Sequence, residues 1–135
     1  MKHKKHVLCE KPIAVNVEQF EKMVASAKEN KVLLMEAMWT RFLPSTLKVR
    51  EVIASKSLGE FKNAYLEFGI SVLGLKNDPG RLFNPNLAGG SLLDVGIYPI
   101  AYTLNLTEAP VKDFTAKAEF SKTGVDTEVI IDFVF

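Results

Sequence analysis

The sequence contains little of what marks disulfide-stabilised, zinc-binding or nucleic-acid-binding proteins. Its 135 residues include a single cysteine, Cys9, which excludes an internal disulfide framework and a multi-cysteine zinc site. The 17 basic and 16 acidic residues leave a net charge of +1, so electrostatics give no case for nucleic acid or an anionic membrane as the main partner. No apolar run approaches about 18 residues, and no signal-peptide core follows the N-terminus. We therefore expect a cytoplasmic protein without a membrane span.

Two further absences concern specific sites. No Gly-x-Gly-x-x-Gly turn follows a strand, so the fingerprint of a dinucleotide pyrophosphate site is missing. His3 and His6 have no third ligand nearby in the sequence, and we predict no metal site. With 47% apolar or aromatic residues, the chain is nevertheless able to bury a sizeable core without cross-links.

The first part of the chain carries the pattern of a strand, a helix and a second strand. Residues 6–9 are a short apolar run that predicts a strand. Asn16, with Gln19 three positions later, forms a capping-box-like helix start, and Asn30 is a suitable helix end. Residues 32–38 predict a second strand, whose lack of alternation is typical of a strand covered on both faces.

This order predicts one βαβ unit with parallel strands and a right-handed crossover. Because parallel strands end at the same edge of a sheet, Glu10, Lys11 and Pro12 are expected to lie beside residues 36–41. That edge is where open α/β sheets bind ligands.

The remainder of the chain predicts an α+β arrangement, with the boundary near residues 40–44. The expected elements are a helix that starts at Pro44 and is closed by Gly59, an alternating strand over residues 64–72, a long loop over residues 74–90, a helix from about Ser91, and an antiparallel hairpin that turns near Thr123 and Gly124.

The strand-end lysine is the first candidate for chemistry. Lys11 lies beside the Glu10 carboxylate and before Pro12, which favours an extended conformation at Lys11. A lysine held at a sheet edge is able to donate hydrogen bonds to a substrate oxygen and polarise it. The alternative is a solvated surface lysine, which is the usual state of this residue type.

Asp94 and Tyr98 are four positions apart in the last predicted helix and therefore share a face. A buried Asp–Tyr hydrogen bond is one interpretation. The other is that Tyr98 is a proton donor, which requires a neighbouring cation that stabilises the phenolate; Lys11 is that cation if the fold brings the two together. Pro99 should bend this helix, and Gly96 should permit close approach of a ligand or another chain.

Two further segments are open to a functional or a structural interpretation. Trp39, Arg41 and Phe42 follow the second strand at the ligand edge and predict either an aromatic wall with a guanidinium donor, or core packing with a surface ion pair. Gly89 and Gly90 predict a permissive turn that opens a helix, a place where anions bind.

Together these motifs resemble the glucose-fructose oxidoreductase, inositol dehydrogenase and rhizopine-catabolism (Gfo/Idh/MocA) family, and within it the branch of dimeric dihydrodiol dehydrogenase and D-xylose dehydrogenase. The resemblance rests on three segments in the family's order: VLCEKP at residues 7–12, EAMWTRF at residues 36–42, and GGSLLDVGIYP at residues 89–99.

The resemblance implies an NAD(P)-dependent oxidoreductase that acts on a sugar, polyol or dihydrodiol-type substrate. It implies that residues 1–42 are the C-terminal part of an NAD(P)-binding Rossmann domain, and that residues 43–135 are part of a mainly antiparallel α+β domain. It also implies roles for single residues. These are catalysis by Lys11, Tyr98 and Asp94, contact with the nicotinamide end of the cofactor by Glu10, Lys11, Pro12 and Arg41, substrate contact by Trp39 and Tyr98, and a cis peptide bond before Pro12.

The departure from the family concerns the phosphate-binding half. The Gly-rich turn expected before residue 1 is absent, and the C-terminal sheet stops at Phe135, so we expect a segment of such an enzyme that assembles as a homo-oligomer through its C-terminal sheet. The alternative is a catalytically inactive piece that serves only in folding or oligomerisation.

Overall fold

The computed structural model describes residues 1–71, 80–107 and 109–135. These residues form two compact units, Met1–Trp39 and Thr40–Phe135. Each unit is described by itself below.

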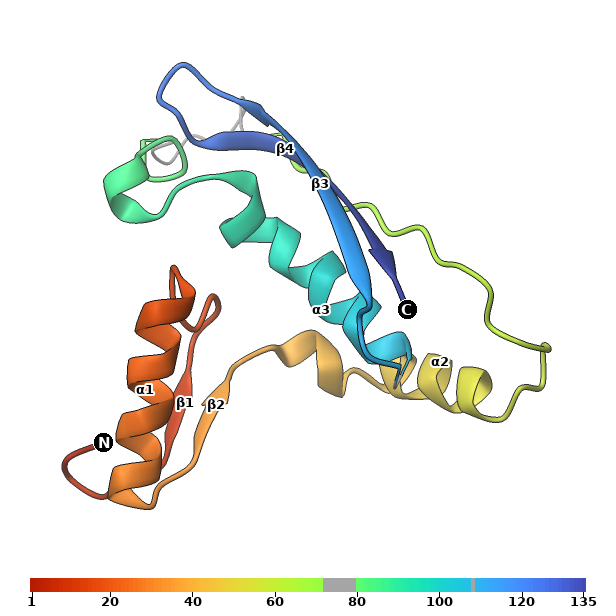
Figure 1. Ribbon diagram of the computed structural model, residues 1–135, viewed down its shortest axis with the longest axis horizontal. Coiled ribbons are helices and arrows are strands. Elements are labelled where there is room, and N and C mark those ends of the chain that lie inside the picture. Colours follow the sequence, from red (N-terminus) through yellow and green to blue (C-terminus); the bar gives the residue numbers. More distant parts are fainter. Residues whose placement is uncertain (72–79, 108) are drawn as a thin grey trace. The chain divides into compact units, whose positions relative to one another are not determined.

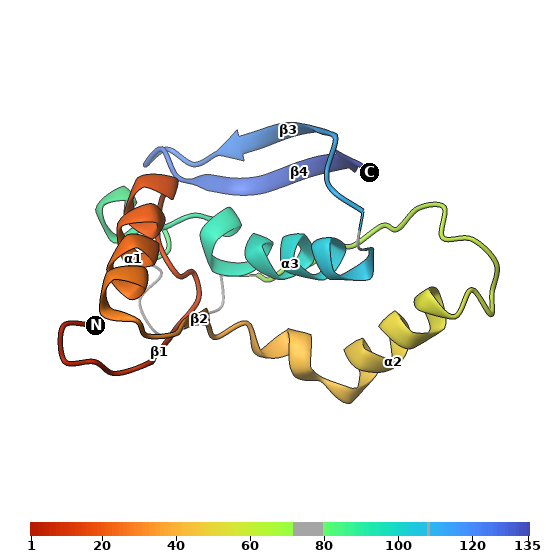
Figure 2. The ribbon, with the colours of Figure 1, turned by 60° about the horizontal axis from the view of Figure 1, so that its bottom comes forward.

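The first unit is the predicted βαβ arrangement. Strand β1 (Val7–Cys9) leads through helix α1 (Val17–Asn30) to strand β2 (Leu34–Glu36), and the two strands pair in parallel. Helix α1 lies along this pair in Figures 1 and 2. The parallel pairing predicted from the sequence is therefore confirmed.

Both ends of α1 are capped as the sequence predicts. The Asn16 side chain accepts a hydrogen bond from the Gln19 N–H at 2.9 Å, which satisfies one of the unpaired donors of the first turn. The helix ends at Asn30, and Lys31 adopts the left-handed conformation at φ 53° while its N–H bonds the carbonyls of Ala27 and Lys28.

Coverage of the second strand on both faces was predicted, and within the described residues this prediction is wrong. Helix α1 covers only one face of the strand pair, and on the other face Leu8, Leu33 and Met35 remain 68%, 70% and 45% exposed. The physical reason is simple, since a single βαβ unit contributes one helix, and one helix covers one face.

A 3₁₀ turn, η1 (Trp39–Phe42), starts at the last residue of the first unit and continues into the second, where helix α2 (Pro44–Ala54) follows. Pro44 occupies the first helical turn, as predicted. The predicted closure by Gly59 is wrong, because the helix ends at Ala54; Gly59 instead closes a later turn at φ +90°, where its N–H bonds the Lys56 carbonyl.

The alternating segment does not form the predicted strand in the described residues. Residues 61–71 form no strand, because no strand of the described residues pairs with them. The backbone groups of a strand need a neighbouring strand as their hydrogen-bond partner. Val72 and residues 74–79 of the predicted loop lie outside the described residues. Residues 80–90 form turns around a 3₁₀ turn, η2 (Pro85–Leu87).

The predicted helix from Ser91 is present in two parts. A π-helical turn, η3 (Leu92–Gly96), precedes helix α3 (Ile97–Leu106). Pro99 has no N–H to donate to the Val95 carbonyl, and in a regular helix a proline ring clashes with the carbonyl four residues before it. The expected bend therefore takes the form of a widened turn directly before the proline, in which the Ile97 N–H bonds the Leu92 carbonyl.

The predicted antiparallel hairpin is confirmed. Strand β3 (Asp113–Phe120) pairs with β4 (Asp126–Val134), and Gly124 lies in the connecting turn at φ +88°. Figures 1 and 2 both show α3 alongside this hairpin. On one face Phe114 lies opposite Phe133, with ring centroids 6.3 Å apart.

By length and composition alone, the segment Pro85–Leu106 is apolar enough to cross a membrane, with a mean hydropathy of 1.2. This differs from the absence of such a run expected from the sequence. The segment is not one continuous helix, however, since Ala88 and Gly90 interrupt it with positive φ values of 52° and 114°. The core helix of a soluble protein meets the same criterion.

Taken unit by unit, the fold is α/β with a parallel strand pair, followed by an α+β part with an antiparallel pair. This agrees with the fold class predicted from the sequence.

Candidate active site

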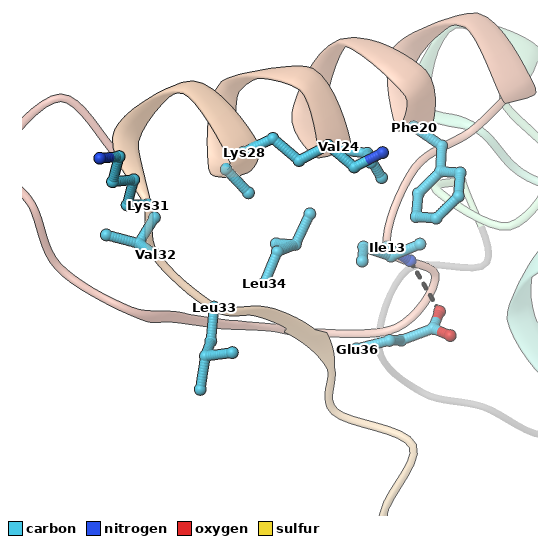
Figure 3. A pocket seen from close by; sticks show the side chains of 10 residues that line it. Ile13, Phe20, Val24, Lys28, Lys31, Val32, Leu33, Leu34 and Glu36 are labelled. Atoms are coloured by element: carbon cyan, nitrogen blue, oxygen red, sulfur yellow. Dashed lines mark hydrogen bonds between the residues drawn. The ribbon is translucent and has the colours of Figure 1, made fainter.

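The sheet edge of the first unit brings two predicted segments together. The Ala37 N–H donates to the Cys9 carbonyl at 2.7 Å, and the Ile13 N–H donates to Glu36 Oε1 at 2.8 Å (Figure 3). These bonds hold the loop after β1 against the end of β2. Glu10, Lys11 and Pro12 therefore leave the sheet beside the segment that leads to Trp39, as predicted.

Within this edge the Lys11–Pro12 peptide bond is cis, as the resemblance implies. Lys11 and Pro12 are half-buried, Glu10 is exposed, and Trp39 is 58% exposed within the chain. The Glu36 carboxylate, which accepts the Ile13 bond, was not singled out from the sequence. Only the structure shows that it ties the loop after Lys11 to β2.

A groove of about 500 Å³ also lies in this unit, between α1 and β2 (Figure 3). Its walls are mainly apolar, with Phe20 and Val24 from the helix and Leu34 from the strand, and Lys28 and Lys31 also line it. None of the predicted site residues lines this groove, so its position gives no support to the predicted chemistry.

In the second unit, an internal carboxylate binds the start of the helical segment. Asp126 Oδ2, from β4, accepts hydrogen bonds from Ser91 Oγ at 2.7 Å and from the Leu92 N–H at 2.6 Å. Free N–H groups at a helix start favour an anion. The sequence predicted a place for an anion at this turn, and in the structure that anion is the chain's own Asp126.

The two glycines before this helix are required by packing. Gly90 has φ +114°, and a Cβ there would run into the Asp126 carboxylate. A Cβ at Gly89 would lie 2.9 Å from the carbonyl oxygens of Arg81 and Asn84. The two glycines therefore allow other parts of the same chain to approach the backbone closely at this point.

Asp94 pairs with an arginine that sequence analysis missed. Arg81 Nη2 lies 3.3 Å from Asp94 Oδ1, and the two side chains are 57% and 25% exposed.

The space next to Gly96, which we expected a ligand or another chain to use, is approached by the Leu92 side chain, 3.2 Å from where a Cβ would lie.

Tyr98 lines a shallow pocket of about 180 Å³ in the second unit. The Phe68 ring is 5.7 Å from the Tyr98 ring at an interplanar angle of 51°. The other residues that line the pocket are Thr40, Leu66, Glu67, Pro99 and Tyr102. Of these aromatic neighbours, Tyr102 was detectable in principle, because it follows Tyr98 by four positions on the same helix.

The predicted site residues thus divide between the two units. Glu10, Lys11, Pro12 and Trp39 belong to the first unit, and Arg41, Asp94 and Tyr98 belong to the second. Arg41 is exposed in η1. The position of η1 is set by buried Thr46, whose hydroxyl donates to the Thr40 carbonyl at 2.8 Å.

Comparison with known families decides the relationship. The family model described as "Oxidoreductase family, NAD-binding Rossmann fold" matches residues 1–38, and the GFO/IDH/MocA C-terminal domain matches residues 46–135. The chain belongs to the GFO/IDH/MocA family.

Individual relatives agree with this assignment. The chain is 36% identical over 137 residues to trans-1,2-dihydrobenzene-1,2-diol dehydrogenase of Danio rerio. This alignment covers 100% of this chain and 40% of that enzyme. It is 38% identical over 130 residues to scyllo-inositol 2-dehydrogenase (NADP(+)) of Bacillus subtilis, over 95% of this chain and 39% of that enzyme. Its fold matches aldose-aldose oxidoreductase from Caulobacter crescentus, solved with glycerol, at a TM-score of 0.82 and 26% identity, over 99% of this chain and 41% of that one.

The alignments also show how much of each relative this chain matches. The chain spans about 40% of the length of the GFO/IDH/MocA relatives that it matches. The matches to both family models lie within it, at residues 1–38 and 46–135.

The contact between Gly90 and Asp126 gives a stability prediction. Gly90→Ala and Gly124→Ala both place alanine at a positive φ, a strain of about 1 to 3 kcal/mol. Only at Gly90 does the new Cβ also meet a carboxylate, because nothing lies within 4 Å at Gly124. We expect Gly90→Ala to lower the free energy of unfolding clearly more than Gly124→Ala, as measured by urea denaturation followed by circular dichroism. Equal losses would mean that the Asp126 carboxylate moves aside at no cost.

Proposed function

We propose that this chain is the part of an NAD(P)-dependent oxidoreductase that supplies its catalytic and substrate-side residues, and that the enzyme acts on CH–OH groups of a sugar, polyol or dihydrodiol-type substrate. The observation that carries the proposal is the sheet edge of the first unit, where the hydrogen bonds of Ala37 and Ile13 present Lys11 beside the segment leading to Trp39. In this proposal residues 1–42 belong to the cofactor-binding domain and residues 43–135 to the substrate and oligomerisation domain.

The residues present fit one end of a nicotinamide cofactor. The carboxyl ends of parallel strands are where α/β sheets bind such ligands, and Glu10, Lys11 and Pro12 lie at that end. Together with Arg41 they are proposed to contact the nicotinamide end. The start of α1 does not fit a pyrophosphate, because the Asn16 side chain already caps it and Glu18 adds a negative charge to its first turn.

When bound, a nicotinamide cofactor supplies hydride transfer. The chain's own residues then have two tasks. Tyr98 exchanges the proton of the substrate hydroxyl, and the Lys11 ammonium donates a hydrogen bond to the same oxygen and stabilises the phenolate of Tyr98. The proposal therefore requires that Lys11 and Tyr98 meet at one substrate oxygen.

Asp94 and the aromatic residues have supporting roles in this proposal. Asp94 lies one turn before Tyr98, where Arg81 holds its side chain in an ion pair at 3.3 Å. Trp39 and Tyr98 are proposed to contact the substrate. The pocket beside Tyr98 adds Phe68 and Tyr102, whose rings offer apolar faces to the C–H groups of a polyol or ring diol.

A second candidate function is a non-catalytic module for folding or assembly. The capped, acidic start of α1 favours it for this chain in isolation, because that helix start does not suit a phosphate group. The two candidates differ in whether the chain alone binds the cofactor.

Cofactor titration tests this point. We expect no saturable binding of NADH or NADPH by residues 1–135 alone up to about 1 mM, a limit that corresponds to roughly 4 kcal/mol of binding free energy. The measurement is the fluorescence of the reduced nicotinamide. Saturable binding by the chain alone would contradict the interpretation of the α1 start and would favour independent activity.

The catalytic roles are best tested in a complete enzyme. We suggest a chimera in which residues 1–135 replace the matching segment of the Danio rerio dehydrogenase. Tyr98→Phe and Lys11→Ala should each lower kcat by about 10²- to 10⁴-fold, the usual contribution of a general acid or base. The measurement is the formation of reduced cofactor with the dihydrodiol as substrate.

Matched controls are available on the same chain. Tyr65→Phe alters a tyrosine that is 89% exposed, and Lys5→Ala alters an exposed lysine near β1. Both control variants should retain the turnover of the chimera. Turnover that survives both Tyr98→Phe and Lys11→Ala would remove the proposed mechanism.

We further propose a cytoplasmic enzyme that forms a homo-oligomer through its C-terminal sheet, with neither nucleic acid nor membrane as a partner. Two observations support the oligomer: every residue of β3 is exposed, and the described residues place no strand at the outer edges of β3 and β4. Unpaired strand edges favour pairing with another strand.

Sedimentation tests the oligomer. At micromolar concentration the chain should sediment as a dimer or larger assembly. Ile130→Asp, which changes a 54% exposed residue of β4, should shift it toward the single protomer, whereas Lys122→Asp in the exposed turn should not. An unmodified chain that sediments as one protomer would contradict this part of the proposal.

A further inference from the structure

The helical segment that carries Asp94 and Tyr98 begins at a contact formed with a distant strand. Ser91 and Leu92, at its first turn, both donate to one oxygen of Asp126, at 2.7 and 2.6 Å. Asp126 is the first residue of β4 and lies 35 positions after Ser91. The start of the segment is thereby tied to the hairpin.

This contact leaves the segment little freedom to shift. The carboxylate of Asp126 is packed against Gly90, where an added Cβ would meet it unless it moved. Hydrogen bonds to a charged acceptor are stronger and shorter than neutral ones, and a negative charge at this end also interacts favourably with the helix dipole. The Asp126 carboxylate therefore contacts Gly90 and accepts the hydrogen bonds of Ser91 and Leu92 at the same time.

The residues after Leu92 make this anchor important for Tyr98. Between Leu92 and Gly96 the backbone forms the wide π turn, and Pro99 withholds one donor from the helix. Wide turns of this kind interrupt the regular bonding that would otherwise fix the helix register. The register of Asp94 and Tyr98 consequently depends on how the first turn is held.

We propose that Asp126 is a positioning residue for Tyr98: by holding Ser91 and Leu92 at the start of the segment, its carboxylate places the Tyr98 hydroxyl for proton exchange with the substrate. This inference rests on the proposed function, in which Tyr98 is the acid and base. Asp126 itself does not touch the substrate in this proposal.

The test uses the chimera that contains residues 1–135. Asp126→Ala removes the acceptor of both hydrogen bonds, and Ser91→Ala removes one of the two donors with a smaller change. We expect Asp126→Ala to lower kcat by about 10- to 100-fold, the effect of a misplacement of roughly 1 Å, and to leave the substrate KM nearly unchanged. Ser91→Ala should lower kcat less, but by more than about twofold.

The control is Glu29→Ala, which removes an exposed carboxylate from α1, away from the proposed oligomer surface, and should leave kcat unchanged. The fraction of folded protein is measured by circular dichroism at the assay temperature, and kcat is expressed per folded molecule. If Asp126→Ala does not fold, Ser91→Ala decides the question. The inference would be overturned if kcat per folded molecule stayed within about twofold of the parent value in Asp126→Ala, or in Ser91→Ala where Asp126→Ala does not fold.

A double variant separates positioning from a purely structural role. If Asp126 acts through Tyr98, then Asp126→Ala in a Tyr98→Phe background should cause little further loss of kcat, because the proton-exchanging group is already gone. Full additivity of the two losses would overturn the inference. Failure of the proposed function gives a different result, since Tyr98→Phe alone would then retain the parent kcat, and the positioning role would fall with it.

Discussion

The carboxylate of Asp126 at the start of the helical segment is the contact on which the second unit depends. It links the hairpin to the helix through two hydrogen bonds, and it requires Gly90 on the opposite side. Because one carboxylate satisfies free helical donors and joins two elements, the loss of this group would affect both. The placement of Asp94, Tyr98 and the aromatic pocket follows from the helix that this contact holds.

The first unit contains a comparable contact, a single hydrogen bond from the Ile13 N–H to the Glu36 carboxylate. Its parallel strands are short, and the bond from Ile13 to the Glu36 carboxylate extends their pairing into the loop that contains Lys11. Both units thus use an acidic side chain from one element to hold the backbone of another. In each case the held backbone leads directly to a residue with a proposed catalytic role.

Much of the fold could be predicted from the sequence, because many of its signals are local. The cap at Asn16, the parallel strands around α1, the proline at the start of α2 and the hairpin turn at Gly124 are all encoded within a few residues. The three family segments likewise indicate Lys11 and Tyr98 through short stretches of sequence. Such signals need no knowledge of distant contacts.

The features that sequence analysis missed are those that depend on distant partners. Residues 61–71 alternate like a strand, but alternation does not supply the neighbouring backbone that a strand requires. Asp126, Arg81 and Thr46 belong to no recognisable sequence motif. Their structural roles come from the residues with which they form hydrogen bonds or ion pairs. The glycine pair predicts a place for an external anion, since nothing near it in sequence reveals Asp126.

The distance between Ser91 and Asp126 along the chain also has a consequence for biosynthesis. The ribosome completes the helical segment before it adds the strand that carries Asp126, so the nascent helix emerges with its first donors facing water. Those donors can acquire their carboxylate only after Asp126 has been added to the chain. The start of the proposed catalytic helix therefore acquires this contact only after most of the chain has been synthesised.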